Sequence, residues 1–389
     1  MTRTAKLLAD LIALPSVNPA ALPPRHPRAG EGRVAEFLAA VAATVGLDVE
    51  FQKVLPQRVN VIARLSPVGK VRQTILLAPH LDTVGVAGEK QFKPTVRAGK
   101  LYGRGACDTK GSVAAFVSAL CELAKAKQRP RETEIIFVGL VDEEHAQAGS
   151  RALVRSPAFR RSGSEDRLKA ELRTLAIVGE PTRCEVVTAH KGSVFVEIET
   201  RGKAAHGAMP QFGRNAVLAA ARVVEFLETD YRKQLQQRKH PLLGHATVSV
   251  GTIRGGSQPN IVPDRCVIGV DRRTLPGETD RSVCREIDAL LRARGIAAKF
   301  SSGRLAPCLP LETSARLPLV RQFLRSAGQS RPVGVHYFCD ASVLAAGGIP
   351  SVVFGPGDIA QAHTADEWIS LAQLERATAM LLNFLKSLP

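Results

Sequence analysis

Short apolar runs along the chain repeatedly end at, or close to, a His, Asp or Glu. Runs of this length are typical of buried parallel strands. Ligands of open α/β sheets gather beyond the carboxyl ends of the strands, so the pattern predicts that the polar residues converge on one crevice. The five runs are 74–79 before His80, 101–107 before Asp108, 135–141 before Asp142-Glu143-Glu144, 175–179 before Glu180, and 351–357 before His363.

The N-terminal half alternates predicted strands with predicted helices up to Glu180. This alternation predicts an α/β domain with a mostly parallel central sheet and helices on both faces. Prolines in Pro15-Ser16-Val17-Asn18-Pro19 end the first helix, and Gly46 ends the second. The same pattern resumes after Pro310. The helices expected in this domain cover 2–14, 31–45, 112–126 and 371–388.

The pattern changes after Glu180-Pro181-Thr182. Residues 193–200 alternate apolar and polar side chains, which is typical of a strand with one face in water. A βαββαβ order follows, and it predicts an inserted α+β ferredoxin-like domain. We therefore expect a catalytic domain from 1–183 and 306–389 and an inserted domain from 184–305. The elements of the insert are strand 193–202, helix 214–229, strands 245–254 and 264–273, helix 279–294 and strand 296–302.

Composition changes this picture little. The 389 residues are 45% hydrophobic and 23% charged, which is ordinary for a soluble globular protein. No apolar stretch is long enough to span a membrane, and the N-terminus lacks the apolar core of a signal peptide. Seven scattered cysteines without a C-x-x-C pair indicate neither a zinc finger nor a disulfide framework. We expect a cytoplasmic protein without a membrane partner.

The net charge of +17 raises the question of nucleic-acid binding. The cations are spread thinly, and the denser stretches at 151–173 and 231–240 are typical of solvated helix faces. No basic motif interleaved with aromatic residues accompanies them, and aromatic residues make up only 5% of the chain. We therefore expect no nucleic-acid partner.

The polar residues after the runs are those that hold metal ions. In an extended segment His80 and Asp82 point the same way, so Asp82 can orient the imidazole of His80. Asp108 alone is also compatible with a helix-capping role. Three adjacent acidic residues at 142–144 repel one another unless cations offset their charge. Neighbours in extended backbone point apart, so one of Glu143 and Glu144 can bind a metal while the other acts as general base.

A charge count supports two divalent cations. Two Zn²⁺ ions are neutralised by Asp108, Glu144, Glu180 and one hydroxide, which leaves Glu143 free to move protons. The mixed nitrogen and oxygen donors suit zinc, with cobalt or manganese as substitutes.

Six motifs together resemble the co-catalytic zinc amidohydrolases and peptidases of the M20 type, and the resemblance covers the whole chain. They are Leu14-Pro15-Ser16-Val17-Asn18-Pro19, His80-x-Asp82, Gly103-Arg104-Gly105-x-x-Asp108-x-Lys110-Gly111, Glu143-Glu144, Gly179-Glu180-Pro181-Thr182, and Gly355-Pro356-Gly357 with His363.

The resemblance implies a role for each residue of the metal site. By it, His80 and Glu180 bind one zinc, Glu144 and His363 bind the other, and Asp108 bridges the two. Glu143 is then the general base and Asp82 orients His80. The family also implies a cis peptide bond after the bridging residue, here Asp108-Thr109.

The inserted domain matches family segments as well. By resemblance it acts as a lid and forms a homodimer, and His206 reaches the active site of the partner subunit to stabilise the oxyanion. Asn260 and Arg272 match positions that hold the substrate carboxylate, for which an Arg fork is well suited. Whether Arg272 or Arg273 faces the substrate depends on strand phase, and the family pattern favours Arg272. Gly207 departs from the His-Ser of many relatives and could alter the oxyanion region.

The resemblance implies hydrolysis of the amide bond of an N-acyl amino acid or small peptide. Glu180 stands where aminopeptidase relatives tend to have Asp, which disfavours aminopeptidase activity. The segment from Phe354 to Glu367 favours deacetylation of acetylornithine, with desuccinylation of succinyl-diaminopimelate or carboxypeptidase and dipeptidase action as alternatives. A non-enzymatic binding protein would be expected to lack a ligand or the base, and all are present.

Overall fold

The computed structural model describes residues 1–126, 129–157 and 173–389. The chain forms two compact units. Unit 1 comprises Met1–Thr188, Thr313–Val333 and Cys339–Pro389, and unit 2 comprises Ala189–Glu312 and Gly334–Phe338. These bounds differ from the expected domain limits by a few residues, and the short return of the chain through 334–338 was not predicted.

A nine-stranded mixed sheet has the order β1-β2-β6-β3-β7-β17-β8-β15, with β16 paired to β8. Its four central strands, β6, β3, β7 and β17, are parallel, whereas β1, β2 and β8 pair antiparallel. The sheet is therefore mixed and not mostly parallel as predicted, because the tight β1-β2 hairpin forces an antiparallel pair. The strands are β1 (Asp48–Leu55), β2 (Arg58–Leu65), β3 (Gln73–Leu77), β6 (Thr133–Gly139), β7 (Thr174–Gly179), β8 (Val187–His190), β15 (Leu311–Glu312), β16 (Val333–Val335) and β17 (Ser351–Phe354).

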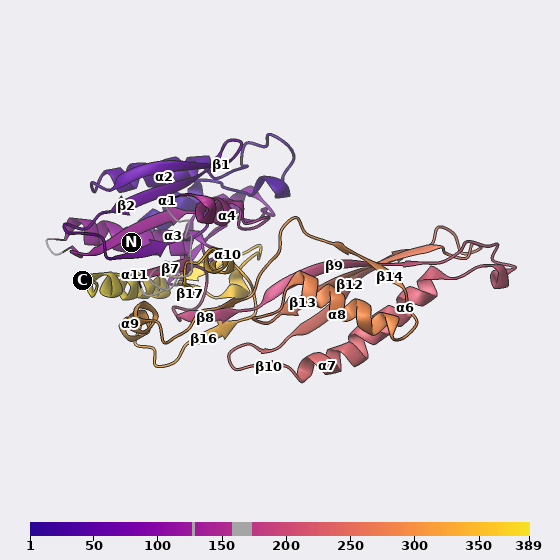
Figure 1. Ribbon diagram of the computed structural model, residues 1–389. Helices are drawn as coiled ribbons and strands as arrows, with labels where there is room; N and C mark the ends of the chain where they lie inside the picture. The colour runs from indigo at the N-terminus through magenta and orange to yellow at the C-terminus, as the bar shows by residue number, and fades with distance from the viewer. Residues whose placement is uncertain (127–128, 158–172) are drawn as a thin grey trace. The chain divides into compact units, whose positions relative to one another are not determined.

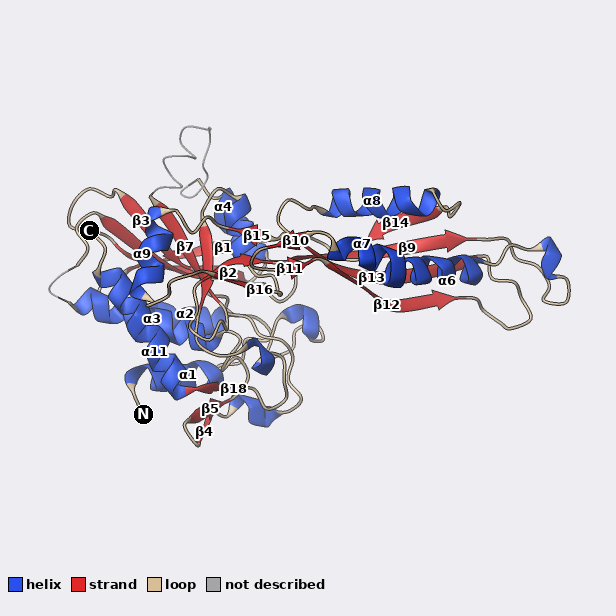
Figure 2. Ribbon diagram, turned by 90° about the horizontal axis from the view of Figure 1, so that it is seen from below, coloured by secondary structure: helices blue, strands red, loops and turns tan. Residues whose placement is uncertain are grey.

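Helices cover both faces of this sheet, as predicted (Figure 2). Side chains at alternate positions of the central strands, such as Leu77 and Phe137, join one large apolar core with α1, α2, α3, α9 and α11. On the opposite face α10 packs against β7, β17 and α4. The helices are α1 (Arg3–Ala13), α2 (Gly32–Ala43), α3 (Lys110–Lys125), α4 (Ala148–Arg155), α9 (Pro318–Ser326), α10 (Ala341–Ala346) and α11 (Leu371–Lys386).

A separate three-stranded sheet has the order β18-β5-β4, from Trp368–Ser370, Lys100–Tyr102 and Thr95–Arg97. The run 101–107 therefore does not form a strand of the central sheet, contrary to the prediction. Only its first two residues belong to β5, because Gly103 and Gly105 adopt φ angles of 152° and 81° that end the extended backbone. Asp108 follows on this loop, directly before α3.

Unit 2 has the element order βαββαβ (Figure 1). Its sheet has the order β12-β13-β9-β14, and all three pairings are antiparallel. Residues of α6 and α8 pack on one face of this sheet, whereas Glu197 and Glu199 of β9 point to the other. The elements are β9 (Gly192–Arg201), α6 (Ala216–Phe226), β12 (Thr247–Gly255), β13 (Arg265–Thr274), α8 (Asp280–Arg292) and β14 (Ala298–Ser302).

A π-helical turn over Leu227–Tyr231 continues α6 into α7 (Arg232–Gln236), and a small hairpin of β10 (Lys239–His240) and β11 (Gly244–His245) follows. Most cationic side chains of 231–240 are exposed, as expected for a solvated face. Most of the other basic stretch, 151–173, lies outside the described residues. Among the helices that the structure describes, none combines the length and the apolar character needed to cross a membrane.

Candidate metal centre

The five predicted metal ligands lie together in unit 1 as two groups that share one residue. His80, Asp108 and Glu180 form one group, and Asp108, Glu144 and His363 form the other. Within each group the ligand atoms lie within 4.8 Å of one another. Glu180 directly follows β7 and His80 lies three residues after the end of β3, whereas Glu144 and His363 are carried on the loops after β6 and β17.

Asp108 lies between the two groups. Its Oδ1 is 3.1 Å from Nε2 of His80, and its Oδ2 is 3.2 Å from Nε2 of His363. The two histidines therefore meet different oxygens of one carboxylate, which is the geometry that a bridging ligand requires. The Asp108-Thr109 peptide bond is cis, which confirms that prediction.

The imidazole of His80 is oriented from its far side. Nδ1 lies 3.0 Å from the backbone carbonyl oxygen of Asp82 and 3.5 Å from Oδ1 of the same residue. Nδ1 therefore carries the proton and donates it, which leaves Nε2 directed at Asp108 and Glu180. The orienting acceptor nearest to the ring is thus the carbonyl of Asp82, with its carboxylate slightly farther away.

The carboxylate of Asp82 holds the segment that carries both glutamates. It accepts hydrogen bonds from the backbone N–H of Glu143 at 3.1 Å and of Glu144 at 3.0 Å. Nδ2 of Asn18 donates to the same carboxylate at 2.8 Å, and it also lies 3.2 Å from Oδ1 of Asp142. Asp82 therefore positions a metal ligand and the candidate base at once.

A buried ion-pair network supports this segment from behind. Arg58 of β2 donates to Oδ1 of Asp142 at 2.7 Å and, through Nε, to Glu31 at 2.9 Å. The Glu31 carboxylate accepts the backbone N–H of Asp142, which adopts the left-handed φ of 72°. Neither Glu31 nor Arg58 stands in a recognisable motif, so no role was predicted for them. Asn18 lies in the motif Leu14-Pro15-Ser16-Val17-Asn18-Pro19, but no role was predicted for it either.

Glu143 belongs to neither ligand group, and several charged side chains near it affect its pKa. Burial raises the pKa of its carboxyl well above the usual value, His80 counteracts this, and the carboxylates of Glu180, Asp340 and Glu144 raise it further. A carboxyl with a raised pKa beside a reaction site is suited to accept and release a proton near neutral pH.

The charges of the centre are unbalanced without cations. The hydrogen bonds that His363 donates to Asp108 and Glu144 raise its pKa to about 10, and the carboxylates around His80 raise the pKa of that imidazole despite burial. Burial raises the pKa of Glu180 as well. The histidines thus hold protons in place of other cations, and a metal ion would displace them because only the neutral imidazole binds metal.

The donors fit divalent cations. Two imidazole nitrogens and three carboxylates make the mixed set that zinc accepts. Oε1 of Glu144 is buried and lacks a hydrogen-bond partner among the described residues, so it remains available to a cation. The side chain of His363 is 55% exposed, so the centre is open to solvent at this residue.

In unit 2 the structure brings two of the three predicted residues together. His206 forms an isolated antiparallel bridge with Ile261, and the N–H of Gly207 donates to the Asn260 carbonyl at 2.7 Å. A side chain at position 207 would meet backbone atoms of Asn260 at 2.8–2.9 Å, which explains why glycine stands there.

The structure buries Arg272, which was predicted to hold the substrate carboxylate. Its side chain is fully buried, and Nη2 donates to Glu278 at 2.6 Å while Nε donates to the Tyr231 hydroxyl at 3.2 Å. Even-numbered residues of β13 face the apolar core, so strand phase places Arg272 inside. Arg273 lies on the other face with a 31% exposed side chain, 3.0 Å from Asp271.

Two further buried residues were not predicted to act at the site. Glu367 accepts hydrogen bonds from the loop that leads to Asp108. Lys110 donates from Nζ to the carbonyl oxygens of Leu11 and Leu14, which ties the start of α3 to the end of α1. Both stand in segments that carried the resemblance, at 103–111 and 354–367, so position in a motif was the available signal.

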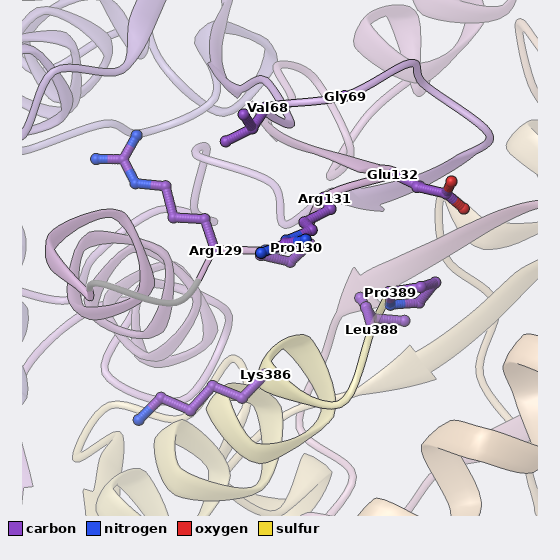
Figure 3. Close-up of a pocket in the computed structure, with 9 residues that line it drawn as sticks. All are labelled: Val68, Gly69, Arg129, Pro130, Arg131, Glu132, Lys386, Leu388 and Pro389. Atoms are coloured by element: carbon purple, nitrogen blue, oxygen red, sulfur yellow. The ribbon is translucent and has the colours of Figure 1, made fainter.

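A separate pocket of about 920 Å³ lies near the C-terminus (Figure 3). Gly69 and Glu132, which line it, precede β3 and β6, so the pocket lies at the amino ends of these strands. The metal ligands follow the carboxyl ends of the same strands. Its other charged residues are Arg129, Arg131 and Lys386, so it has one carboxylate against three cations and cannot form a comparable metal site.

Known proteins resemble the chain over most of its length. The model of "Peptidase family M20/M25/M40" matches residues 76–387. An acetylornithine deacetylase of Myxococcus xanthus is 32% identical over 359 residues, which cover 89% of each chain. The solved structure of the aminopeptidase PepT from Bacillus cereus has a TM-score of 0.74 at 22% identity, covering 99% of this chain and 97% of that one.

A second solved structure, the YXEP protein of Bacillus subtilis, is described as a dinuclear metal-binding peptidase of the M20 family. It has a TM-score of 0.69 at 15% identity and covers 99% of this chain and 97% of that chain. Together with the two ligand groups that share Asp108, these matches show that the chain belongs to peptidase family M20/M25/M40 and is a metal-dependent hydrolase.

Proposed function

We propose that the protein hydrolyses the amide bond of N-acetyl-L-ornithine, releasing acetate and ornithine. The observation that carries this proposal is the pair of ligand groups joined by Asp108, with Glu143 beside them and outside both. The 32% identical relative from Myxococcus xanthus carries the name of this activity, which supports the choice of substrate.

His80 and Glu180 would hold one Zn²⁺, Glu144 and His363 the other, and Asp108 both, with Co²⁺ or Mn²⁺ as substitutes. When bound, two such ions lower the pKa of water, polarise the amide carbonyl and stabilise the negative charge of the transition state. The backbone carbonyl and the carboxylate of Asp82 keep the imidazole of His80 directed at its ion.

Glu143 would act as the general base. Its carboxylate takes a proton from the attacking water and returns it to the nitrogen of the leaving amine, so that the carboxylate is regenerated in each turnover. The two backbone hydrogen bonds to Asp82 fix the segment that carries Glu143 and thereby limit the movement of the base during this transfer.

Unit 2 would supply substrate binding, as a lid and dimerisation domain. We assign the carboxylate of the substrate to Arg273 and Asn260, because Arg272 is occupied by Glu278. His206 would stabilise the oxyanion.

The spacing of these residues supports a homodimer. Arg265 pairs with Arg201 at the end of β13 nearest the His206 and Asn260 segments, and Arg273 is eight residues farther along the strand. At about 3.3 Å per residue this separation is roughly 26 Å, which is too long for one small substrate. A second copy of the chain would therefore bring its His206 and Asn260 to the substrate held by Arg273.

The test measures acetate release from N-acetylornithine by the zinc-loaded, the chelator-treated and the zinc-restored protein. We expect release in the first and third samples and little in the second. N-succinyl-diaminopimelate and a small dipeptide serve as parallel substrates. Turnover of one of these, without acetate release from N-acetylornithine, would refute the substrate and retain the metal chemistry.

A further inference from the structure

Glu367 is a buried carboxylate whose contacts all converge on the loop that carries Asp108. Its Oε1 accepts the backbone N–H of Cys107 at 2.8 Å and of Asp108 at 2.9 Å. Its Oε2 accepts the N–H of Gly105 at 2.9 Å and Nη1 of Arg104 at 2.6 Å. Both oxygens are thus fully used, and none of these contacts is to a predicted metal ligand's side chain.

The loop is folded around this carboxylate. Successive backbone N–H groups that point to one place form a concave anion-binding nest, which is usually filled by a ligand or an ion. Here the protein fills it with its own side chain. Gly105, with φ of 81°, makes the turn possible, and a side chain there would meet Lys110 at 2.9 Å.

The same carboxylate joins two segments that are distant in sequence. Glu367 lies four residues after His363 and directly before β18, and its carbonyl accepts the N–H of Gly103 at 3.0 Å. Strand β18 pairs with β5, with Trp368 opposite Tyr102. One short region therefore carries a ligand of one metal group and the anchor of the residue shared by both.

We propose that Glu367 is a positioning residue that sets the carboxylate of Asp108 between the two metal positions. The N–H of Asp108 is fixed by Oε1, so the backbone of the bridging residue cannot rotate without breaking a charge-assisted hydrogen bond. Arg104 neutralises Glu367 and so keeps its negative charge from competing with the metal centre. The inference rests on the proposed metal centre and is independent of the proposed substrate.

Glu367→Gln is the variant that tests the proposal most directly. It keeps the size of the side chain but places an NH₂ group against two donors, so at least two hydrogen bonds to the loop are lost. Glu367→Asp retains the charge on a side chain one methylene shorter and tests for partial rescue. Asp366→Asn is the matched control, because it removes one negative charge from the neighbouring, exposed residue.

The readout is zinc and cobalt binding by equilibrium dialysis, together with the visible spectrum of the cobalt-loaded protein. Loss of an outer partner of a ligand typically lowers metal affinity about 10–100-fold. We expect that loss for Glu367→Gln with a changed cobalt spectrum, a smaller loss for Glu367→Asp, and wild-type binding for Asp366→Asn. Circular dichroism of the metal-free variants is expected to match that of the wild type.

Two wild-type-like ions in Glu367→Gln, with an unchanged cobalt spectrum, would overturn the proposal. A wild-type protein that does not bind a pair of ions would overturn it as well. If Glu367→Gln does not fold, Glu367→Asp and Arg104→Met decide by the same measurements. Because these assays contain no substrate, failure to hydrolyse N-acetylornithine would leave this inference intact and refute only the proposed function.

Discussion

Both units bury charged side chains, but they balance them differently. At the centre in unit 1, five carboxylates (Asp82, Asp108, Glu143, Glu144 and Glu180) surround two histidines. In unit 2 the buried Arg272 has a matching partner in Glu278, and its Nε–H donates to the Tyr231 hydroxyl. Buried groups whose charges cancel within the fold serve stability. An excess of negative charge in a buried cluster indicates that a bound ligand supplies the missing positive charge.

If the centre in unit 1 serves catalysis, the largest loss of turnover is expected from substitution of Glu143. A Glu143→Gln variant removes the base and leaves both ligand groups complete. We expect turnover to fall about 10²–10⁴-fold, the range typical of general acid–base catalysis, at unchanged metal content. Steady-state kinetics and metal analysis check this, with exposed Glu185→Gln as control. Full turnover in Glu143→Gln would show that another group moves the proton.

Substitutions of Arg272 and Arg273 are expected to affect different properties, namely the stability of unit 2 and the binding of substrate. Arg272→Met leaves Glu278 with Arg238, 3.5 Å away, as its remaining ion-pair partner among the described residues. We therefore expect the free energy of unfolding to fall by less than the roughly 3–5 kcal/mol that is typical of breaking a fully buried pair. Arg273→Met is expected to change stability little and to raise KM for N-acetylornithine about tenfold at a similar kcat. Denaturant unfolding and kinetics of both variants are compared. Reversed effects would return the binding role to Arg272.

A further effect, on the pH dependence of stability, is expected from His190. Burial lowers the pKa of this histidine from 6.5 to about 4, and its Nδ1 lies 2.9 Å from the Lys191 carbonyl. Between pH 6.5 and 4 the unfolded chain takes up a proton that the folded chain refuses, so stability falls as the pH is lowered. The difference of about 2.5 pKa units corresponds to roughly 3 kcal/mol over this window.

A His190→Gln variant is expected to lose this part of the acid sensitivity, measured as denaturant unfolding of the metal-free protein from pH 7 to 4. His26→Gln, at a partly exposed position, controls for the loss of a histidine as such. An equal slope in His190→Gln and the wild type would show that His190 does not contribute.

Sequence patterns predicted the parts of the molecule that local rules determine. His80 and Glu180 follow buried strands, so their convergence could be read from the apolar runs. The antiparallel pairing of the strands at the sheet edges could not be predicted from such runs, because strand pairing depends on contacts between residues that are distant in sequence. The burial of Arg272 was not predicted, because positions 272 and 273 are both arginines and only the register of β13 decides which of the two is buried. Glu31, Arg58 and Glu367 act through contacts with residues far away in the chain, and no local pattern reveals these.

The order in which the ligands occur along the chain has a consequence for biosynthesis. His80, Asp108 and Glu180 all precede unit 2, whereas His363 and the Glu367 anchor follow it. A nascent chain that has emerged only through residue 312 thus carries every ligand of one group but lacks His363 of the other. The second group is complete only after residue 363 has emerged as well.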